Sequence, residues 1–455
     1  MTTPRAQSDT APAAAPAAAR GRWVRSPAQA GAALVALVCL TAAFLFGRVE
    51  LVLIAAPLLL AALVDRAWRP EAGAAVQLTA SVAIPAGDGR PSTVPVVLTA
   101  APTSNSRPDA VHLRLATADR APFDAVLAPR SAARLRLEIE VRHSGPQRVL
   151  SAEARAIGAD ASWAGDPADS GPGASVERVV RPVAVPIRSL PLPARLLGLT
   201  GQHVSARPGD GGEFRDVDRY RAGDRLRRID WKATARRAQR PGELYVRRTT
   251  ATSDAAVHLV LDARDDLPGE VADWAASYPR PGLRSLDIAR EAAVSLAAAY
   301  AGMADRVGFD DLADAARALP PRAGARHRQA VLRAIETTPA RGSVTDRIRV
   351  PRLAPGALVY VLSTFLDDQP VRLALAWRAA GHRVIAVDVL PPLTTEQLPA
   401  RERIALRLVL AEREVRFERL RMSGAERLVW ASTERDVQLR RLAAPQRRAT
   451  SGRPA

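Results

Sequence analysis

The chain has 455 residues, of which 47% are apolar and 25% are charged, so it is long enough for about two or three globular domains. Its formal net charge is +18, but the basic side chains are almost all arginine and are spread along the whole chain, so we expect no nucleic acid partner. The single cysteine, Cys39, excludes an intrachain disulfide, and the absence of HExxH, CxxC, Walker A and GxSxG motifs leaves the corresponding hydrolases and nucleotidases unsupported.

The N-terminal segment, residues 1–25, consists mainly of Ala, Pro, Ser and Arg. Such a composition cannot bury enough apolar surface to form a core. We therefore expect a disordered tail there.

Residues 26–69 predict a transmembrane hairpin. Residues 26–47 carry no charge and, at about 1.5 Å per residue, can cross a hydrocarbon core of about 30 Å. The second apolar run, residues 51–64, is shorter and would need flanking residues to span. Arginines lie outside both runs, so the positive-inside rule predicts a multi-pass protein of the cell membrane with its soluble domains in the cytoplasm. The alternative is a signal peptide that ends near residue 47.

Residues 70–195 predict a β-rich domain. Short β-branched segments alternate with Gly, Pro, Asp and Ser clusters, which is typical of a small β-sandwich. The expected strands are residues 74–84, 94–100, 110–118, 133–142 and 176–187.

Residues 251–420 predict a doubly wound α/β domain, because apolar strands alternate with segments of helical periodicity. The expected strands are residues 255–262, 305–312, 356–364 and 382–390, and the expected helices are residues 285–302, 325–338 and 369–381. Ligands of such folds bind at the carboxyl ends of the strands, where Asp262, Ser363 and Asp388 lie. Residues 421–455 are expected to form a basic tail that is helical or disordered.

Between these two domains, residues 196–250 contain a densely charged segment, "GGEFRDVDRYRAGDRLRRIDWKATARR" at 211–237. This segment resembles the signature of the bacterial family catalogued as domain of unknown function 58. The residues that carry the resemblance are Phe214, Arg219, Tyr220, Gly223, Asp224, Arg228, Ile229, Asp230, Trp231, Lys232, Ala235 and Arg236.

The resemblance implies a membrane-anchored cytoplasmic protein that works beside a MoxR-type AAA ATPase as an adaptor or assembly factor. It also implies that the C-terminal domain is similar to von Willebrand factor type A domains, and it implies no enzymatic activity. The alternative is a cell-envelope-associated enzyme or structural factor. No nucleophile–base or metal-ligand constellation is visible in the sequence, which favours the adaptor.

The signature segment offers candidate residues for partner binding or for a conformational switch. These residues are Arg219, Tyr220, Asp224, Arg228, Asp230, Trp231, Lys232 and Arg236. An internal ion-pair network and binding of a polyanion are the two alternatives. Leu226, Ile229 and Ala233 have helical spacing and could pack along one face of a helix. Lys232 is the only lysine of the chain, and its compact ammonium would suit a cramped site that rejects a guanidinium.

Type A domains often bind Mg²⁺ or Mn²⁺ through an Asp-x-Ser-x-Ser loop, a Thr and an Asp, which supply the oxygen ligands of a hard cation. Here Asp262 is present, but Arg264 replaces the first serine, and Thr345 could supply the second loop. The sequence therefore predicts a degenerate metal site in which Arg264 puts its own cation where the metal would lie. We expect no cofactor, and Mg²⁺ is the one candidate.

Overall fold

The computed structural model describes residues 22–67, 74–82, 93–103, 108–117, 120–128, 132–158, 162–166, 173–194, 196, 201–276, 282–342, 346–347 and 349–444. The chain divides into two compact units, which are described separately. The first comprises Met1–Val141 and Arg148–Glu177, and the second comprises Arg142–Gln147 and Arg178–Ala455.

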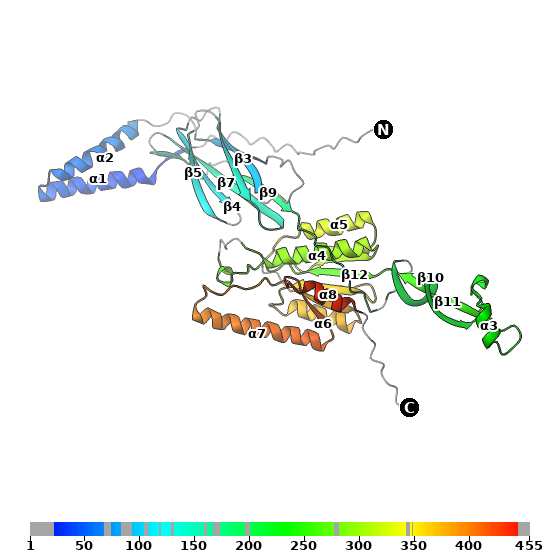
Figure 1. Cartoon of the computed structure of the whole chain (residues 1–455). Coiled ribbons are helices and arrows are strands. Elements are labelled where there is room, and N and C mark those ends of the chain that lie inside the picture. The colour runs from blue at the N-terminus through cyan, green and yellow to red at the C-terminus, as the bar shows by residue number, and fades with distance from the viewer. Residues whose placement is uncertain are drawn as a thin grey trace, which may run out of the picture. The chain divides into compact units, whose positions relative to one another are not determined.

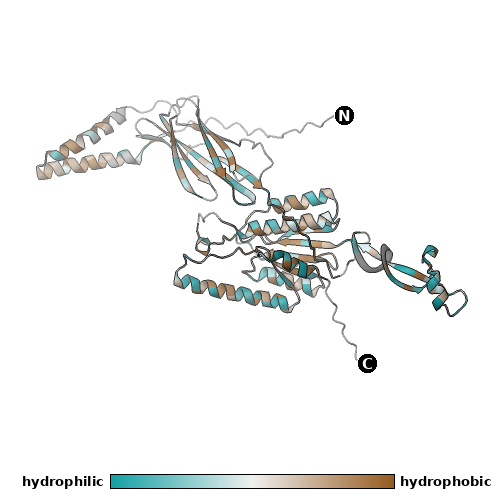
Figure 2. Cartoon of the chain, in the orientation of Figure 1, coloured by the Kyte–Doolittle hydropathy of each residue, from teal (hydrophilic) through white to brown (hydrophobic). Residues whose placement is uncertain are grey.

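Two apolar helices open the first unit, α1 (Pro27–Phe46) and α2 (Glu50–Ala67). Gly47 ends α1 with a φ of 62°, a left-handed conformation that glycine adopts at low cost, and the chain then reverses into α2. Residues Gln29–Phe46 of α1 are long and apolar enough to cross a membrane, whereas the apolar part of α2, Glu50–Ala61, is shorter. Both helices are largely brown in the hydropathy view (Figure 2).

The rest of the first unit is a β domain with two sheets. One sheet has the order β1-β8-β7-β4-β5, with β9 also paired to β7, and the other has the order β2-β3-β6. Alternate residues of β4, such as Val111, Leu113 and Leu115, are fully buried, as the alternating pattern predicts. The strands are β1 (Trp23–Arg25), β2 (Val76–Val82), β3 (Thr93–Pro102), β4 (Ala110–Thr117), β5 (Arg120–Leu127), β6 (Ala133–Glu140), β7 (Gly145–Ile157), β8 (Trp163–Gly165) and β9 (Ala174–Val180).

The strand β1 corrects the predicted N-terminal tail. Residues 23–25 pair antiparallel with β8, so the tail expected over residues 1–25 is wrong for its last three residues. The backbone hydrogen bonds to β8 order these residues, although their local composition does not favour a folded structure. Residues 1–21 lie outside the described residues.

The second unit contains a six-stranded sheet in the order β14-β13-β12-β15-β16-β17, in which β14 alone is antiparallel to its neighbour. Helices cover both faces (Figure 1). One core joins α4, α5 and α8 to side chains such as Leu259 of β12, and the other joins α6 and α7 to side chains such as Val361 of β15. The elements are β12 (Ala256–Leu261), α4 (Ser285–Gly302), β13 (Arg306–Asp311), β14 (Asp314–Arg322), α5 (Ala325–Glu336), β15 (Leu358–Ser363), α6 (Gln369–Ala379), β16 (Arg383–Asp388), α7 (Ala400–Met422), β17 (Glu426–Val429) and α8 (Arg435–Ala443).

The C-terminal boundary of this α/β domain differs from the prediction. Residues 421–455 were expected as a basic tail, but β17 is a parallel strand of the sheet beside β16, and α8 packs against it. Leu428, Trp430 and Leu439 are fully buried there. Burial of these few apolar side chains extends the domain through α8. Residues 445–455 lie outside the described residues.

A two-stranded antiparallel ribbon, β10 (His203–Arg219) with β11 (Tyr245–Ser253), leads into β12 (Figure 1). At its base His203 pairs with Ser253, and at its far end Arg219 pairs with Tyr245. The buried Asp305 carboxylate fixes the base, because it lies 2.9 Å from His203 Nε2 and accepts a hydrogen bond of 2.8 Å from the Ala255 N–H. The signature segment therefore lies at the end of the ribbon that is farther from the sheet.

Candidate functional site

We call residues 219–240, at the far end of the ribbon, the tip segment. It contains a short 3₁₀ helix (Leu226–Arg228) and the helix α3 (Trp231–Arg237). Asp230 is the N-cap of α3, and its Oδ1 accepts a hydrogen bond of 2.9 Å from the Ala233 N–H. This capping interaction explains why an aspartate precedes Trp231.

The tip segment is attached to the strand β11 by backbone and side-chain hydrogen bonds. The Asp230 N–H donates to the Tyr245 carbonyl at 2.8 Å, and the Tyr245 N–H donates to Thr234 Oγ1 at 3.0 Å. Ile229 is extended, with φ −61° and ψ 124°, and forms an isolated bridge to Val246. The expected single helix through Leu226, Ile229 and Ala233 is therefore wrong, because bridging to β11 interrupts the helix before Asp230.

Several charged residues of the signature form ion pairs with residues that follow it in the chain. Arg248 Nη1 contacts Asp218 Oδ2 at 2.6 Å, and Arg219 Nε contacts Glu243 Oε1 at 2.6 Å. The Asp224 carboxylate accepts a hydrogen bond of 2.9 Å from the Arg221 N–H and thus fixes the turn at Gly223. A backbone hydrogen bond from Arg219 and the nearby Arg248 cation lower the pKa of Asp218. Within the predicted set, Arg219 and Asp224 thus take part in ion pairs of the ribbon, Asp224 through Arg248 at 3.6 Å.

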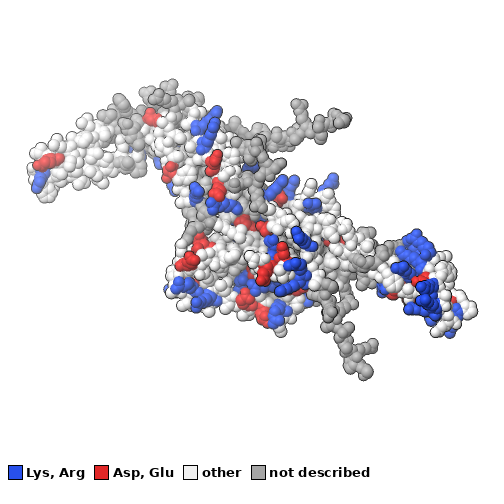
Figure 3. Space-filling view, in the orientation of Figure 1, with Lys and Arg blue, Asp and Glu red and all other residues white. Residues whose placement is uncertain are grey.

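Other residues of the predicted set face solvent. Trp231 is 68% exposed, although burial is the usual state of large apolar side chains. Leu226, which is not in the predicted set, is 66% exposed in the same tip segment. Lys232 and Arg236 are also exposed, so the cramped site expected around Lys232 is wrong. Tyr220 and Arg228 are intermediate in exposure. In the space-filling view, Lys and Arg side chains gather over this end of the ribbon (Figure 3).

The second predicted site lies at the carboxyl end of β12. Asp262 is 5% exposed, and both of its oxygens accept hydrogen bonds from Arg264, at 2.8 Å from Nε and 2.9 Å from Nη2. Arg264 Nη2 also contacts Asp367 at 2.8 Å, and Ser363 Oγ donates to Asp262 at 2.7 Å. The planar guanidinium of Arg264 thus pairs with the carboxylate that a metal cation would otherwise bind.

The surroundings of Asp262 bear on the metal prediction. Burial raises the pKa of Asp265, and the nearby carboxylates of Asp262 and Asp367 raise it further. Among the residues that the structure describes, no group of three or more His, Cys, Asp or Glu side chains is placed to hold a metal ion. The predicted second-loop ligand, Thr345, lies outside the described residues.

Arginine–carboxylate pairs also lie at or near the carboxyl ends of two other strands. At the end of β16, Asp388 contacts Arg413 and, at 2.7 Å, Arg427. In β13, Asp310 makes two hydrogen bonds with Arg347, of 2.8 and 2.9 Å. Sequence reasoning placed Asp388 near a strand end but missed its arginine partners, because they are distant in sequence and carry no local signal.

The comparison with known families concerns the part of the chain that holds both sites. Residues 216–437 match the sequence model of the family described as "Protein of unknown function DUF58". This part of the chain belongs to the DUF58 family. The DUF58 region includes the tip segment, the six-stranded sheet and the first turn of α8, and the resemblance seen in the signature is thereby confirmed.

Curated relatives of this DUF58 protein are found in mycobacteria. An uncharacterized protein of Mycobacterium bovis and uncharacterized proteins of two strains of Mycobacterium tuberculosis are each 30% identical to it over 207 residues. The match covers 44% of this chain and 61% of each relative. The chain thus matches about three fifths of the length of these relatives.

Proposed function

We propose that this DUF58 protein is a membrane-anchored cytoplasmic adaptor or assembly factor that binds a MoxR-type AAA ATPase through its tip segment. One observation carries the proposal: Trp231 and Leu226 are two-thirds exposed at the end of a ribbon whose backbone is fixed by hydrogen bonds. Tryptophan and arginine are the residues that most often dominate binding energy at protein interfaces. A rigid support also lowers the entropic cost of binding.

The charge of the tip segment specifies the chemistry of its partner. Residues 219–240 contain nine basic and two acidic side chains. The complementary surface is acidic and has an apolar pocket for the Trp231 side chain. Charge complementarity would accelerate association and would select against basic partners.

The apolar helices support the membrane anchor. α1 is long enough to span, and α2 would complete a two-helix hairpin if residues beyond its apolar part entered the interface. Arginines precede the first apolar run and follow the second, whereas Glu50 offsets Arg48 in the turn between them. By the positive-inside rule, this pattern supports a cytoplasmic location of the soluble domains.

The strand order supports a likeness to von Willebrand factor type A domains. Numbered along the chain, the sheet has the order 3-2-1-4-5-6 with an antiparallel third strand. In such a domain a metal at the strand ends would be the expected binding device, but here Arg264 is bound to Asp262. Partner binding through the tip segment is consistent with this substitution.

Affinity capture of the full-length protein from detergent-solubilised native membranes, followed by quantitative mass spectrometry, tests the proposal. We expect the wild type to enrich a MoxR-type ATPase, and Trp231→Ala to recover at least about 30-fold less at limiting concentration, as for a hot spot of about 2 kcal/mol. Phe123→Ala is the matched control, because Phe123 is an aromatic side chain that is 42% exposed on β5, outside the tip segment.

Two results would contradict the proposal. Equal recovery by the wild type and Trp231→Ala would show that the tip segment is not the docking surface. If the wild type enriched no ATPase, the adaptor function would fail and the cell-envelope factor would take its place.

A further inference from the structure

The helix α7 has two apolar faces on opposite sides. Its inner face packs on the sheet through Phe417 and Leu420, and Leu406 on the same face is also buried. A helix that covers a sheet normally has a polar outer face. On the outer face of α7, however, Ile404, Leu408 and Val415 are 59%, 64% and 61% exposed.

The spacing of the outer face is that of a coiled-coil seam. The positions are separated alternately by four and three residues, which keeps one stripe facing a partner helix. The six positions of this seam are Ile404, Leu408, Ala411, Val415, Glu418 and Met422. Met422, at the last of them, is 74% exposed. The pattern covers almost the whole of the 23-residue helix.

We propose that a second copy of this chain covers this face, with the two α7 helices packed antiparallel about a two-fold axis. In one register Ile404 lies opposite Val415 of the second copy, and Leu408 lies opposite Ala411 of the second copy. Each of these contacts occurs twice, as the symmetry of an isologous dimer requires.

The charges of α7 match the same register. One turn beyond Ile404, Arg401 lies opposite Glu418 of the second copy. Beside the seam, Arg407 lies opposite Glu414 of the second copy. The dimer thus has four intermolecular Arg–Glu pairs. A parallel dimer would instead place Arg401 against Arg401 and Glu418 against Glu418 within the seam, and like charges in contact are destabilising.

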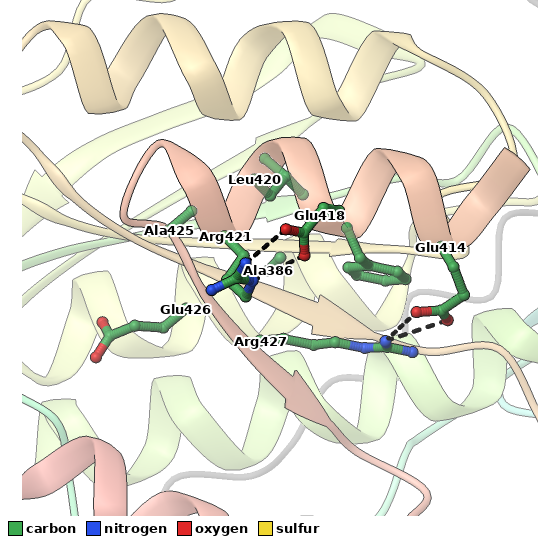
Figure 4. A pocket seen from close by; sticks show the side chains of 9 residues that line it. Ala386, Glu414, Glu418, Leu420, Arg421, Ala425, Glu426 and Arg427 are labelled. Atoms are coloured by element: carbon green, nitrogen blue, oxygen red, sulfur yellow. Dashed lines mark hydrogen bonds and ion pairs between the residues drawn. The ribbon is translucent and has the colours of Figure 1, made fainter.

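The two glutamates are accessible for these pairs. Glu414 contacts Arg427 at 3.1 Å, and Glu418 contacts Arg421, around a small cavity between α7 and β17 (Figure 4). The Glu414 and Glu418 side chains are 61% and 55% exposed. An added guanidinium from the second copy can therefore share either carboxylate.

Single-cysteine crosslinking of the full-length protein in detergent tests the dimer and its register. In a Cys39→Ser background, Ala411→Cys places the two thiols about 4.5 Å apart along the helix axes, and Ala400→Cys places them about 28 Å apart. We expect a short bismaleimide to give a crosslinked dimer with Ala411→Cys and none with Ala400→Cys. Excess cysteine-free protein should suppress the crosslink by exchange.

Two further variants separate a specific dimer from chance collision. Leu408→Asp should lower the crosslinked fraction at least about tenfold, because it buries an unpaired carboxylate in the seam. Arg407→Glu should also lower it, and Arg407→Glu/Glu414→Arg should restore it. Absence of the Ala411→Cys crosslink, crosslinking of Ala400→Cys, or insensitivity to Leu408→Asp would each overturn the proposal.

Discussion

The substitution Arg264→Ser tests how the carboxyl end of β12 is stabilised. Arg264 is 7% exposed and neutralises Asp262, which is 5% exposed. After the substitution, Asp262 would keep the Ser363 hydroxyl but lose its cation. Breaking a buried pair by removing one partner costs about 3–5 kcal/mol, and the remaining hydroxyl places the expected cost near the lower limit, about 3 kcal/mol.

Hydrogen exchange of the full-length protein, measured on peptides from β12 and β15, is the suitable assay because it reports local opening. A cost of about 3 kcal/mol corresponds to exchange that is faster by about 160-fold. The matched control is Arg322→Ser, which removes an exposed arginine from the end of β14 and should leave these peptides unchanged.

The same variant tests the metal prediction. Without the guanidinium, the oxygens of Asp262, Ser363 and Asp367 and the introduced hydroxyl form a set that suits a hard divalent cation. Millimolar Mg²⁺ should restore slow exchange in Arg264→Ser and have no effect on the wild type. Unchanged exchange in the variant, or an equal response of the wild type to Mg²⁺, would refute the assignment of Arg264 as the resident cation.

Two further predictions concern single side chains. Burial, together with nearby His382, lowers the pKa of His258 to about 4, so the unfolded chain takes up this proton near pH 6.5 and the folded chain only near pH 4. The free energy of unfolding should therefore fall by about 3 kcal/mol as the pH drops through that window. His258→Gln should weaken this pH dependence, which denaturant unfolding at pH 7 and 4.5 would measure. An equal loss of stability in the wild type and His258→Gln would contradict the reasoning. Asp230→Ala should destabilise α3 by about 1 kcal/mol and accelerate hydrogen exchange of the Ala233 amide about fivefold. Asp230→Asn keeps a hydrogen-bond acceptor and should change this exchange rate little. Equal exchange rates in the two variants would show that the N-cap does not protect the Ala233 amide.

The sequence predicted the α/β sheet well where the signal is local. The helix α4 spans the same residues as its prediction, Ser285–Gly302, because small apolar residues recur there at helical spacing. β12, β15 and β16 are buried along their whole length, and they are mostly apolar; the exceptions are His258, Ser363, Arg383 and Asp388. β17 has only four residues, two charged and two apolar, so its place in the sheet depends on tertiary packing.

The candidate sites, too, could be predicted from the sequence only where the signal is local. Arg264 lies two residues from Asp262, and this pair could be predicted from the loop itself. The ribbon could not, because β10 contains glycine and proline and is ordered chiefly by its pairing with β11. Nor could the sequence show that Trp231 stays exposed, since a tryptophan beside a helical stripe is equally consistent with packing.

The two proposed interfaces differ from the strand ends of the sheet in how their charged residues are used. The planar fork of arginine satisfies a carboxylate with two hydrogen bonds, and Arg264, Arg347 and Arg383 each do so with a buried or half-buried acid of the sheet. These acids are therefore engaged within the domain. The exposed apolar residues at the tip segment and on α7 involve different side chains, so their functions should be separable. Trp231→Ala should lower capture of the ATPase at least about 30-fold and leave the α7 crosslink intact. Leu408→Asp should lower the crosslinked fraction and leave capture of the ATPase intact. Loss of both in either variant would mean that one surface depends on the other.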